Sequence, residues 1–193
     1  MAKICMNSFF KLIVIGGSSG SLEALINIFN LLDPAFNIPI LIILHRNIAP
    51  NDSLCKVLAS KTLLQVKEAD EKDIPLPGEV YLAPPDYHLL IEKDGSLSLD
   101  DSEKVRFSRP SIDVSFQSAA NVYKNKLLAI LLSGANADGS EGMQGIKSLG
   151  GTLIVQDPGE AMVNTMPLNA LAATPVNHIL TTGAIAHYLN NLL

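Results

Sequence analysis

Charged residues, cysteine and long apolar runs are all scarce in this sequence. Only 17% of the 193 residues are charged, and the two cysteines, Cys5 and Cys55, lack the spacing of a metal site. So little cysteine favours a reduced, cytosolic setting over a disulfide scaffold. We therefore expect neither a bound metal nor structural disulfides.

Positive charge is also in short supply. Lys and Arg total 14 against 19 Asp and Glu, which gives a net charge of −5. Nucleic-acid binding and attachment to anionic lipid both need clustered basic side chains. The charge balance therefore argues against either partner.

No stretch is apolar for long enough to cross a bilayer. The most apolar runs, residues 40–44 and 127–132, are far shorter than the roughly 20 residues that a spanning helix needs. Near the N-terminus, Lys11 interrupts an apolar run over residues 9–15, and no small-residue cleavage site follows. We interpret that run as a first strand and not as a signal peptide.

Apolar residues, by contrast, are abundant. They make up 48% of the chain, and the mean hydropathy is +0.28. This excludes a disordered tail and a solvated coiled coil, and the length suits one domain with a sizeable core. We expect residues 1–193 to form a single domain.

Short apolar runs alternate with helical periodicity along the chain. Strands are predicted at residues 12–15, 40–44, 80–83, 88–92, 96–100, 127–132, 152–156 and 179–180. Helices are predicted at residues 21–32, 51–60, 112–123, 141–149, 167–173 and 184–193. Residues 68–73 are interpreted as a solvated acidic loop.

Several predicted strands are apolar on both faces, so both faces need a cover of helices. The expected fold is a doubly wound, mostly parallel α/β sheet with helices on both faces. Asp94-Gly95 between two β-like runs predicts a central antiparallel hairpin. In such sheets, ligands and catalytic groups gather beyond the carboxyl ends of the strands.

The first strand ends in a glycine-rich turn with a Gly-x-Ser-x-Gly frame at Gly16, Ser18 and Gly20. Such a turn can expose a nucleophilic serine above the sheet, next to the amides of a helix start. The frame equally allows phosphate binding or a simple flexible turn. It does not match the dinucleotide-binding pattern, whose glycines are spaced differently.

Two further strand ends carry polar groups. His45 directly follows the strand at 40–44, where it is either a general base or an ordinary surface histidine. Asp138 lies in the turn after the strand at 127–132, where it either orients an imidazole or caps the helix that follows. Serine, histidine and aspartate together are the set needed for nucleophilic acyl transfer. Their order along the chain differs from the Ser, Asp, His order of α/β-hydrolases.

Several segments, in this order, resemble the catalytic domain of the CheB family of chemotaxis protein-glutamate methylesterases. They are Ile13-Val14-Ile15-Gly16-Gly17-Ser18-Ser19-Gly20, Leu44-His45, Pro77-Gly78-Glu79-Val80-Tyr81-Leu82-Ala83-Pro84, Arg109-Pro110-Ser111-Ile112-Asp113, Ser133-Gly134 through Asp138-Gly139, and Met166-Pro167. The resemblance extends from about Lys11 to about Thr182. It covers nearly the whole chain.

The resemblance implies a cytoplasmic hydrolase that removes glutamyl methyl esters from chemoreceptors and releases methanol, with deamidation of glutamines as a second activity. Ser18 would be the nucleophile, His45 the base and Asp138 its orienting acid. The amides of Ser19 and Ala135 would bind the oxyanion. Candidate substrate-binding residues are Gly17, Arg46, Arg109, Asn136 and Met166. No cofactor is implied, and the oligomeric state is left open.

The chain also departs from the family pattern. Ala135-Asn136 replaces Met-Gly in the aspartate loop, Leu44 replaces Gln, Arg46 replaces Met, and Ser21 replaces Gly. Asn136 is uncomfortable if that position needs a positive φ. No receiver domain is expected before the catalytic domain, so phosphorylation control through one is not expected either. The changed aspartate loop motivates an alternative, a catalytically weak or inactive homologue that acts as a receptor- or anion-binding domain.

Overall fold

The computed structural model describes residues 9–46 and 54–192. Strands of the main sheet are β1 Leu12–Gly17, β2 Ile40–Leu44, β3 Gln65–Glu68, β4 Glu79–Leu82, β7 Leu127–Leu131, β8 Thr152–Gln156 and β9 His178–Leu180. Helices are α1 Ser21–Leu31, α2 Leu54–Ala59, α3 Ile112–Tyr123, α4 Ser140–Ser148, α5 Thr165–Ala173 and α6 Thr182–Asn190, with a 3-10 turn at Lys124–Lys126. A separate antiparallel pair consists of β5 His88–Ile91 and β6 Leu97–Asp100.

The main sheet has seven strands in the order β3-β4-β2-β1-β7-β8-β9, and every neighbouring pair is parallel. The chain leaves β1 toward β2 on one side and later returns to β7 on the other. The doubly wound parallel sheet is thus confirmed, with its switch point at β1. The predicted hairpin is also confirmed, but it forms a sheet of its own.

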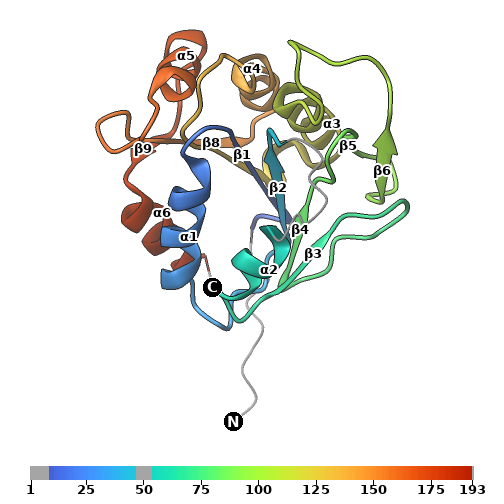
Figure 1. Ribbon diagram of the computed structural model, residues 1–193, viewed down its shortest axis with the longest axis horizontal. Coiled ribbons are helices and arrows are strands. Elements are labelled where there is room, and N and C mark those ends of the chain that lie inside the picture. Colours follow the sequence, from blue (N-terminus) through green and yellow to red (C-terminus); the bar gives the residue numbers. More distant parts are fainter. Residues whose placement is uncertain (1–8, 47–53, 193) are drawn as a thin grey trace.

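Each face of the sheet has its own apolar core. Ile13 and Ile15 pack with α1, α2 and α6, whereas Leu12 and Val14 pack with α3, α4, α5 and the β5–β6 hairpin. Figure 1 shows these two groups of helices on opposite sides of the sheet. β1 is buried along its whole length, because a strand covered on both faces leaves neither set of side chains in water.

The sequence missed β3. Its side chains are only partly buried, and it lies at the edge of the sheet beside β4. Gln65–Glu68 therefore has no need of the apolar run that reveals a central strand. The interpretation of residues 68–73 as a loop was wrong at Glu68, which ends this strand. The caps predicted for α2 at residues 51–53 lie outside the described part of the chain.

Candidate active site

The ends of β1, β2 and β7 meet at one edge of the sheet. Gly17 at the end of β1 pairs with Leu44 at the end of β2, and Gly16 pairs with Leu131 of β7. The next residues along the chain are Ser18 after β1 and His45 after β2. The loop that carries Asp138 follows β7. The three predicted strand ends therefore converge at the carboxyl edge beside the switch point.

Backbone contacts hold the Ser18 turn in place. The Ser18 amide donates to Ser133 O at 2.9 Å, and the Ser21 hydroxyl donates to Ser18 O. Gly20 has a φ of 82°, a left-handed conformation that starts α1 without a steric penalty. The Ser18 side chain remains partly exposed, and its hydroxyl forms no hydrogen bond within residues 9–46 and 54–192.

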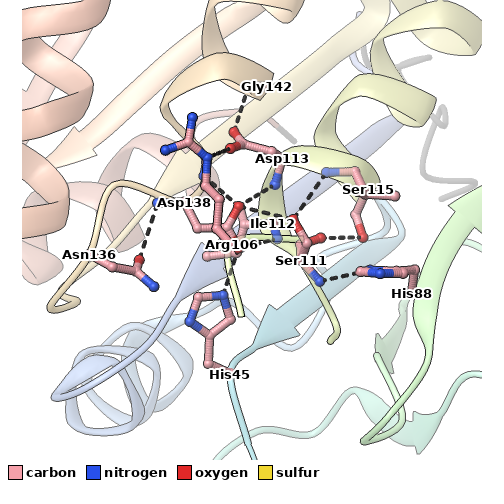
Figure 2. A network of polar contacts seen from close by, with 12 residues as sticks. His45, His88, Arg106, Ser111, Ile112, Asp113, Ser115, Asn136, Asp138 and Gly142 are labelled. Atoms are coloured by element: carbon pink, nitrogen blue, oxygen red, sulfur yellow. Dashed lines mark hydrogen bonds and ion pairs between the residues drawn. The ribbon is translucent and has the colours of Figure 1, made fainter. Parts of the chain in front are cut away.

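His45 and Asp138 are in direct contact, as Figure 2 shows. Nε2 of His45 lies 2.7 Å from Oδ2 of Asp138, and 13% of the His45 side chain is exposed. The His45 amide also donates to Gly17 O at 3.3 Å, which ties the histidine to the Ser18 turn. An ionised Asp138 accepts the Nε2 hydrogen, and this tautomer leaves Nδ1 as a proton acceptor.

The start of α3 surrounds the Asp138 carboxylate with donors. The amides of Ile112 and Asp113 donate to Oδ2 at 2.8 Å and to Oδ1 at 2.9 Å, and the Ser111 hydroxyl donates to Oδ1 at 3.0 Å. The Asp138 side chain is fully buried. The predicted alternative, a cap on the helix that follows Asp138, is wrong: the N-cap of α4 is Gly139, and apart from the Gly139 amide the backbone donors to the Asp138 carboxylate belong to α3.

This environment sets the charge of Asp138. Burial raises the pKa of the carboxyl. The hydrogen bonds from His45 and from the amides of Asp113 and Ile112 lower it by more than burial raises it, so the net pKa lies below its ordinary value. Hydrogen bonds to the charged form and a helix N-terminus both favour the carboxylate. The arrangement therefore provides an ionised acid that can orient an imidazole.

Ser111 and His88 support this site, and the sequence did not assign them a role. His88 is buried, its Nδ1 accepts from the Ser111 amide at 3.1 Å, and its Nε2 donates to Glu103 O at 3.1 Å. Ser111 is the N-cap of α3. A serine directly before an apolar helix is a cap signal that could have been read from the sequence.

The turn after β1 and the loop after β7 each offer a backbone amide to a ligand. Among the residues that the structure covers, neither the Ser19 amide nor the Ala135 amide has an acceptor. Asn136 does not adopt a positive φ, so the strain expected there does not arise. Instead its Oδ1 accepts from the Asp138 amide at 3.1 Å and stabilises the loop.

The remaining substrate-binding candidates contact other parts of the protein. Arg46 pairs with Glu68 and donates to Ala83 O at 3.1 Å. Nη2 of Arg109 donates to Oδ1 of Asp86 at 2.9 Å, and its guanidinium also donates to backbone oxygens of its own loop. Met166 is buried, and its sulfur would lie 2.7 Å from a Cβ placed on Gly134. Gly17 is a buried strand residue. Binding of substrate by these residues stays a prediction.

Neither a metal-binding cluster nor a membrane-spanning helix is found in the described part of the chain. Residues 9–46 and 54–192 contain no group of three or more His, Cys, Asp or Glu side chains arranged to hold a metal ion. No helix among them is long and apolar enough to span a membrane.

A sequence model described as CheB methylesterase matches residues 13–189. The chain belongs to the CheB methylesterase family. The match includes Ser18, His45 and Asp138, the residues at the three strand ends. The resemblance read from the motifs is thereby confirmed.

Individual CheB-type relatives agree with this assignment. A Leptospira interrogans protein, provisionally named protein-glutamate methylesterase/protein-glutamine glutaminase, is 44% identical over 92% of this chain and 92% of its own length. A Thermotoga maritima protein with the same name is 34% identical over 95% of this chain but only 54% of its own. The chain thus spans about half the length of that relative.

A solved structure extends the similarity to three dimensions. The crystal structure of the Thermotoga maritima CheB methylesterase catalytic domain matches with a TM-score of 0.90 at 34% identity. The match covers 95% of this chain and 99% of that one. The fold of this chain is that of a CheB catalytic domain.

Proposed function

We propose that this protein hydrolyses glutamyl methyl esters on chemoreceptors in the cytoplasm, through a Ser18-His45-Asp138 triad and an acyl-enzyme. The observation that carries the proposal is the 2.7 Å contact between His45 Nε2 and a buried Asp138, beside the Ser18 turn. The names of the matched relatives supply the substrate class.

In the first step, Nδ1 of His45 takes the hydroxyl proton of Ser18 while Oγ attacks the ester carbonyl. Asp138 stabilises the imidazolium that forms and keeps the ring in place. The bond between the carbonyl carbon and the methoxy oxygen then breaks, and methanol leaves with the proton from His45. The product of this half-reaction is a glutamyl ester of Ser18.

The amides of Ser19 and Ala135 are the proposed donors to the oxyanion of the tetrahedral intermediate. Both lack an acceptor in the described part of the chain, so neither has to break a hydrogen bond to serve. An oxyanion donor of this kind typically lowers a barrier by about 3–4 kcal/mol. Ala135 can act as well as the Met of the family, because only its backbone is used.

Water resolves the acyl-enzyme in the second step. His45 removes a proton from the water, hydroxide adds to the glutamyl carbonyl, and Ser18 leaves with that proton. The receptor is left with a free glutamate. A glutamine side chain would follow the same route with ammonia as the leaving group, which is the proposed deamidase activity. No step requires a cofactor.

Labelling with a serine-directed phosphonate tests the nucleophile directly. We expect mass spectrometry to find the adduct on Ser18 and to find none in the Ser18→Ala variant. The Thermotoga maritima catalytic domain serves as the positive control. If that domain is labelled and this protein is not, the alternative of a receptor- or anion-binding homologue is favoured instead.

A further inference from the structure

Helices α3 and α4 cap each other through two aspartates. Asp138, just before α4, accepts hydrogen bonds from the amides of Ile112 and Asp113 at the start of α3. Asp113, in the first turn of α3, accepts from the Gly142 amide of α4 at 2.7 Å. Each helix N-terminus is therefore satisfied by a carboxylate from the other segment. Figure 2 shows both carboxylates in one network with His45.

The two helices approach closely where they exchange these bonds. A Cβ placed on Gly142 would lie 2.5 Å from the Cβ of Phe116 and 3.2 Å from the backbone of Asp113. No side chain fits in this space. A change in the Asp113–Gly142 contact is therefore passed to the start of α4 and to the loop that carries Asp138.

The other oxygen of Asp113 has little compensation. Oδ2 is buried and accepts no hydrogen bond from residues 9–46 or 54–192, and it forms an ion pair with Nε of Arg106 at 3.6 Å. The Arg106 side chain is 44% exposed and also pairs with Glu141. The charged groups that face Asp113 are thus Arg106, Glu141 and Asp138.

The surroundings of Asp113, including the nearby Asp138 carboxylate, consequently disfavour its charged form. Burial raises the pKa of Asp113, the Gly142 amide lowers it and the charges of Asp138 and Glu141 raise it, with a net pKa of about 6. A residue that only capped α4 would not need to sit against a second buried acid. Its place beside Asp138 connects it to the orientation of His45.

We infer that Asp113 is a positioning residue. By holding the start of α4 against α3 through Gly142, it fixes the direction in which the Asp138 carboxylate points at His45. Its importance for turnover rests on the proposed function, whereas its effect on the His45–Asp138 hydrogen bond does not.

Two substitutions separate the acceptor from the charge. Asp113→Ala removes the acceptor for the Gly142 amide, whereas Asp113→Asn keeps one oxygen that can accept from Gly142 and replaces the other oxygen with an uncharged amide NH2. Glu141→Gln is the matched control, since it removes a charge from α4 at a side chain that is 67% exposed. Circular dichroism checks that each variant is folded.

The readout without substrate is the low-field ¹H NMR signal of the His45 Nε2 hydrogen, assigned by its loss in His45→Gln. We expect Asp113→Ala to shift this signal upfield or to broaden it by faster exchange with water. Asp113→Asn and Glu141→Gln should leave it in place. A purely structural role would lower the melting temperature without moving the signal in the folded protein.

The second readout is turnover of a methylated receptor. We expect Asp113→Ala to lower kcat by about 10–100-fold with KM changed less than about threefold, as is common when a supporting residue is lost. Asp113→Asn should restore kcat to within about threefold of wild type. Rescue by the isosteric amide would show that the acceptor is what matters.

Either of two results overturns the inference: an unchanged signal and kcat in Asp113→Ala, or an Asp113→Asn variant that behaves like Asp113→Ala. If Asp113→Ala does not fold, Asp113→Ser replaces it, because its hydroxyl is too short to reach Gly142. If the signal responds as expected but the wild-type protein hydrolyses no ester, the proposed function fails and the positioning role of Asp113 stands.

Discussion

The acid and the nucleophile of the proposed triad have very different surroundings. On one side, Asp138 is fully buried and accepts from the Ser111 hydroxyl and from amides at the start of α3. On the nucleophile side, Ser18 is partly exposed, and within residues 9–46 and 54–192 only its backbone forms hydrogen bonds. The proposed acid is thus held from several directions, whereas the hydroxyl of the proposed nucleophile has no hydrogen bond to any residue that the structure describes.

The difference agrees with the proposed role of each group. An orienting acid is useful only in one position, so many donors and a rigid helix start are an advantage. A nucleophile has to move from a proton acceptor to a carbonyl carbon, so a hydroxyl that is locked in a hydrogen bond would be a disadvantage. Substitutions on the two sides should therefore differ in how they divide their effects between activity and stability.

Ser18→Ala should give the largest effect on activity and almost none on stability. We expect ester hydrolysis to fall by about 10⁴-fold or more, with the unfolding free energy changed by less than about 0.5 kcal/mol. Methanol release and urea unfolding measure the two quantities. Survival of turnover in Ser18→Ala together with its loss in Ser19→Ala would move the nucleophile by one residue.

Asp138→Asn should reduce both quantities. We expect kcat to fall by about 10³–10⁴-fold because the wrong imidazole tautomer is favoured, and stability at pH 7 to fall by about 1–3 kcal/mol. Since the pKa of Asp138 is lowered by folding, its stabilising contribution is present above the ordinary value of 3.8 and is lost as the pH falls through the folded value.

Urea unfolding of wild type and Asp138→Asn at several pH values checks that sign. The difference between the two proteins should shrink as the pH is lowered toward 3. A difference that grows in acid would mean that Asp138 is protonated in the folded protein, and it would remove the basis for its role.

How much of this could be read from the sequence depends on how local the signal is. The bounds predicted at 40–44, 112–123 and 152–156 agree with β2, α3 and β8, because buried strands and an amphipathic helix carry their pattern within themselves. β3 carries no such pattern, since an edge strand gains its place from its neighbour.

The same distinction applies to the site. Ser18, His45 and Asp138 each follow an apolar strand, so their common edge could be predicted. The contact of Asp113 with Gly142 joins residues on two helices, and no residue spacing in the sequence predicts it. The role of Asn136 was also hidden, because its substitution for glycine suggested strain while its side chain in fact bonds to the Asp138 amide.

Ser133→Ala should have a moderate effect on the nucleophile side. The Ser133 hydroxyl donates to Ser19 O at 2.7 Å and accepts from the Val163 amide at 2.9 Å, inside the protein. We expect a loss of about 1–2 kcal/mol in stability and a fall in kcat of about 10-fold as the Ser18 turn loosens. Ser133→Thr, which keeps the hydroxyl, should retain most of both. Equal losses in the two variants would show that packing and not the hydroxyl holds the turn.

Asp113→Asn should have the smallest effect on activity, and its effect on stability should be opposite in sign to that of Asp138→Asn. Folding raises the pKa of Asp113 from 3.8 to about 6, so the folded protein binds this proton more tightly than the unfolded chain does. Its contribution is thus most favourable below pH 4 and is lost as the pH rises through 6. We expect Asp113→Asn to match wild type at pH 4 and to be more stable by about 2–3 kcal/mol at pH 7.5. Urea unfolding at both pH values measures this. A variant less stable than wild type at pH 7.5 would mean that Arg106 compensates the buried charge fully, and the contrast between the two aspartates would then be one of position alone.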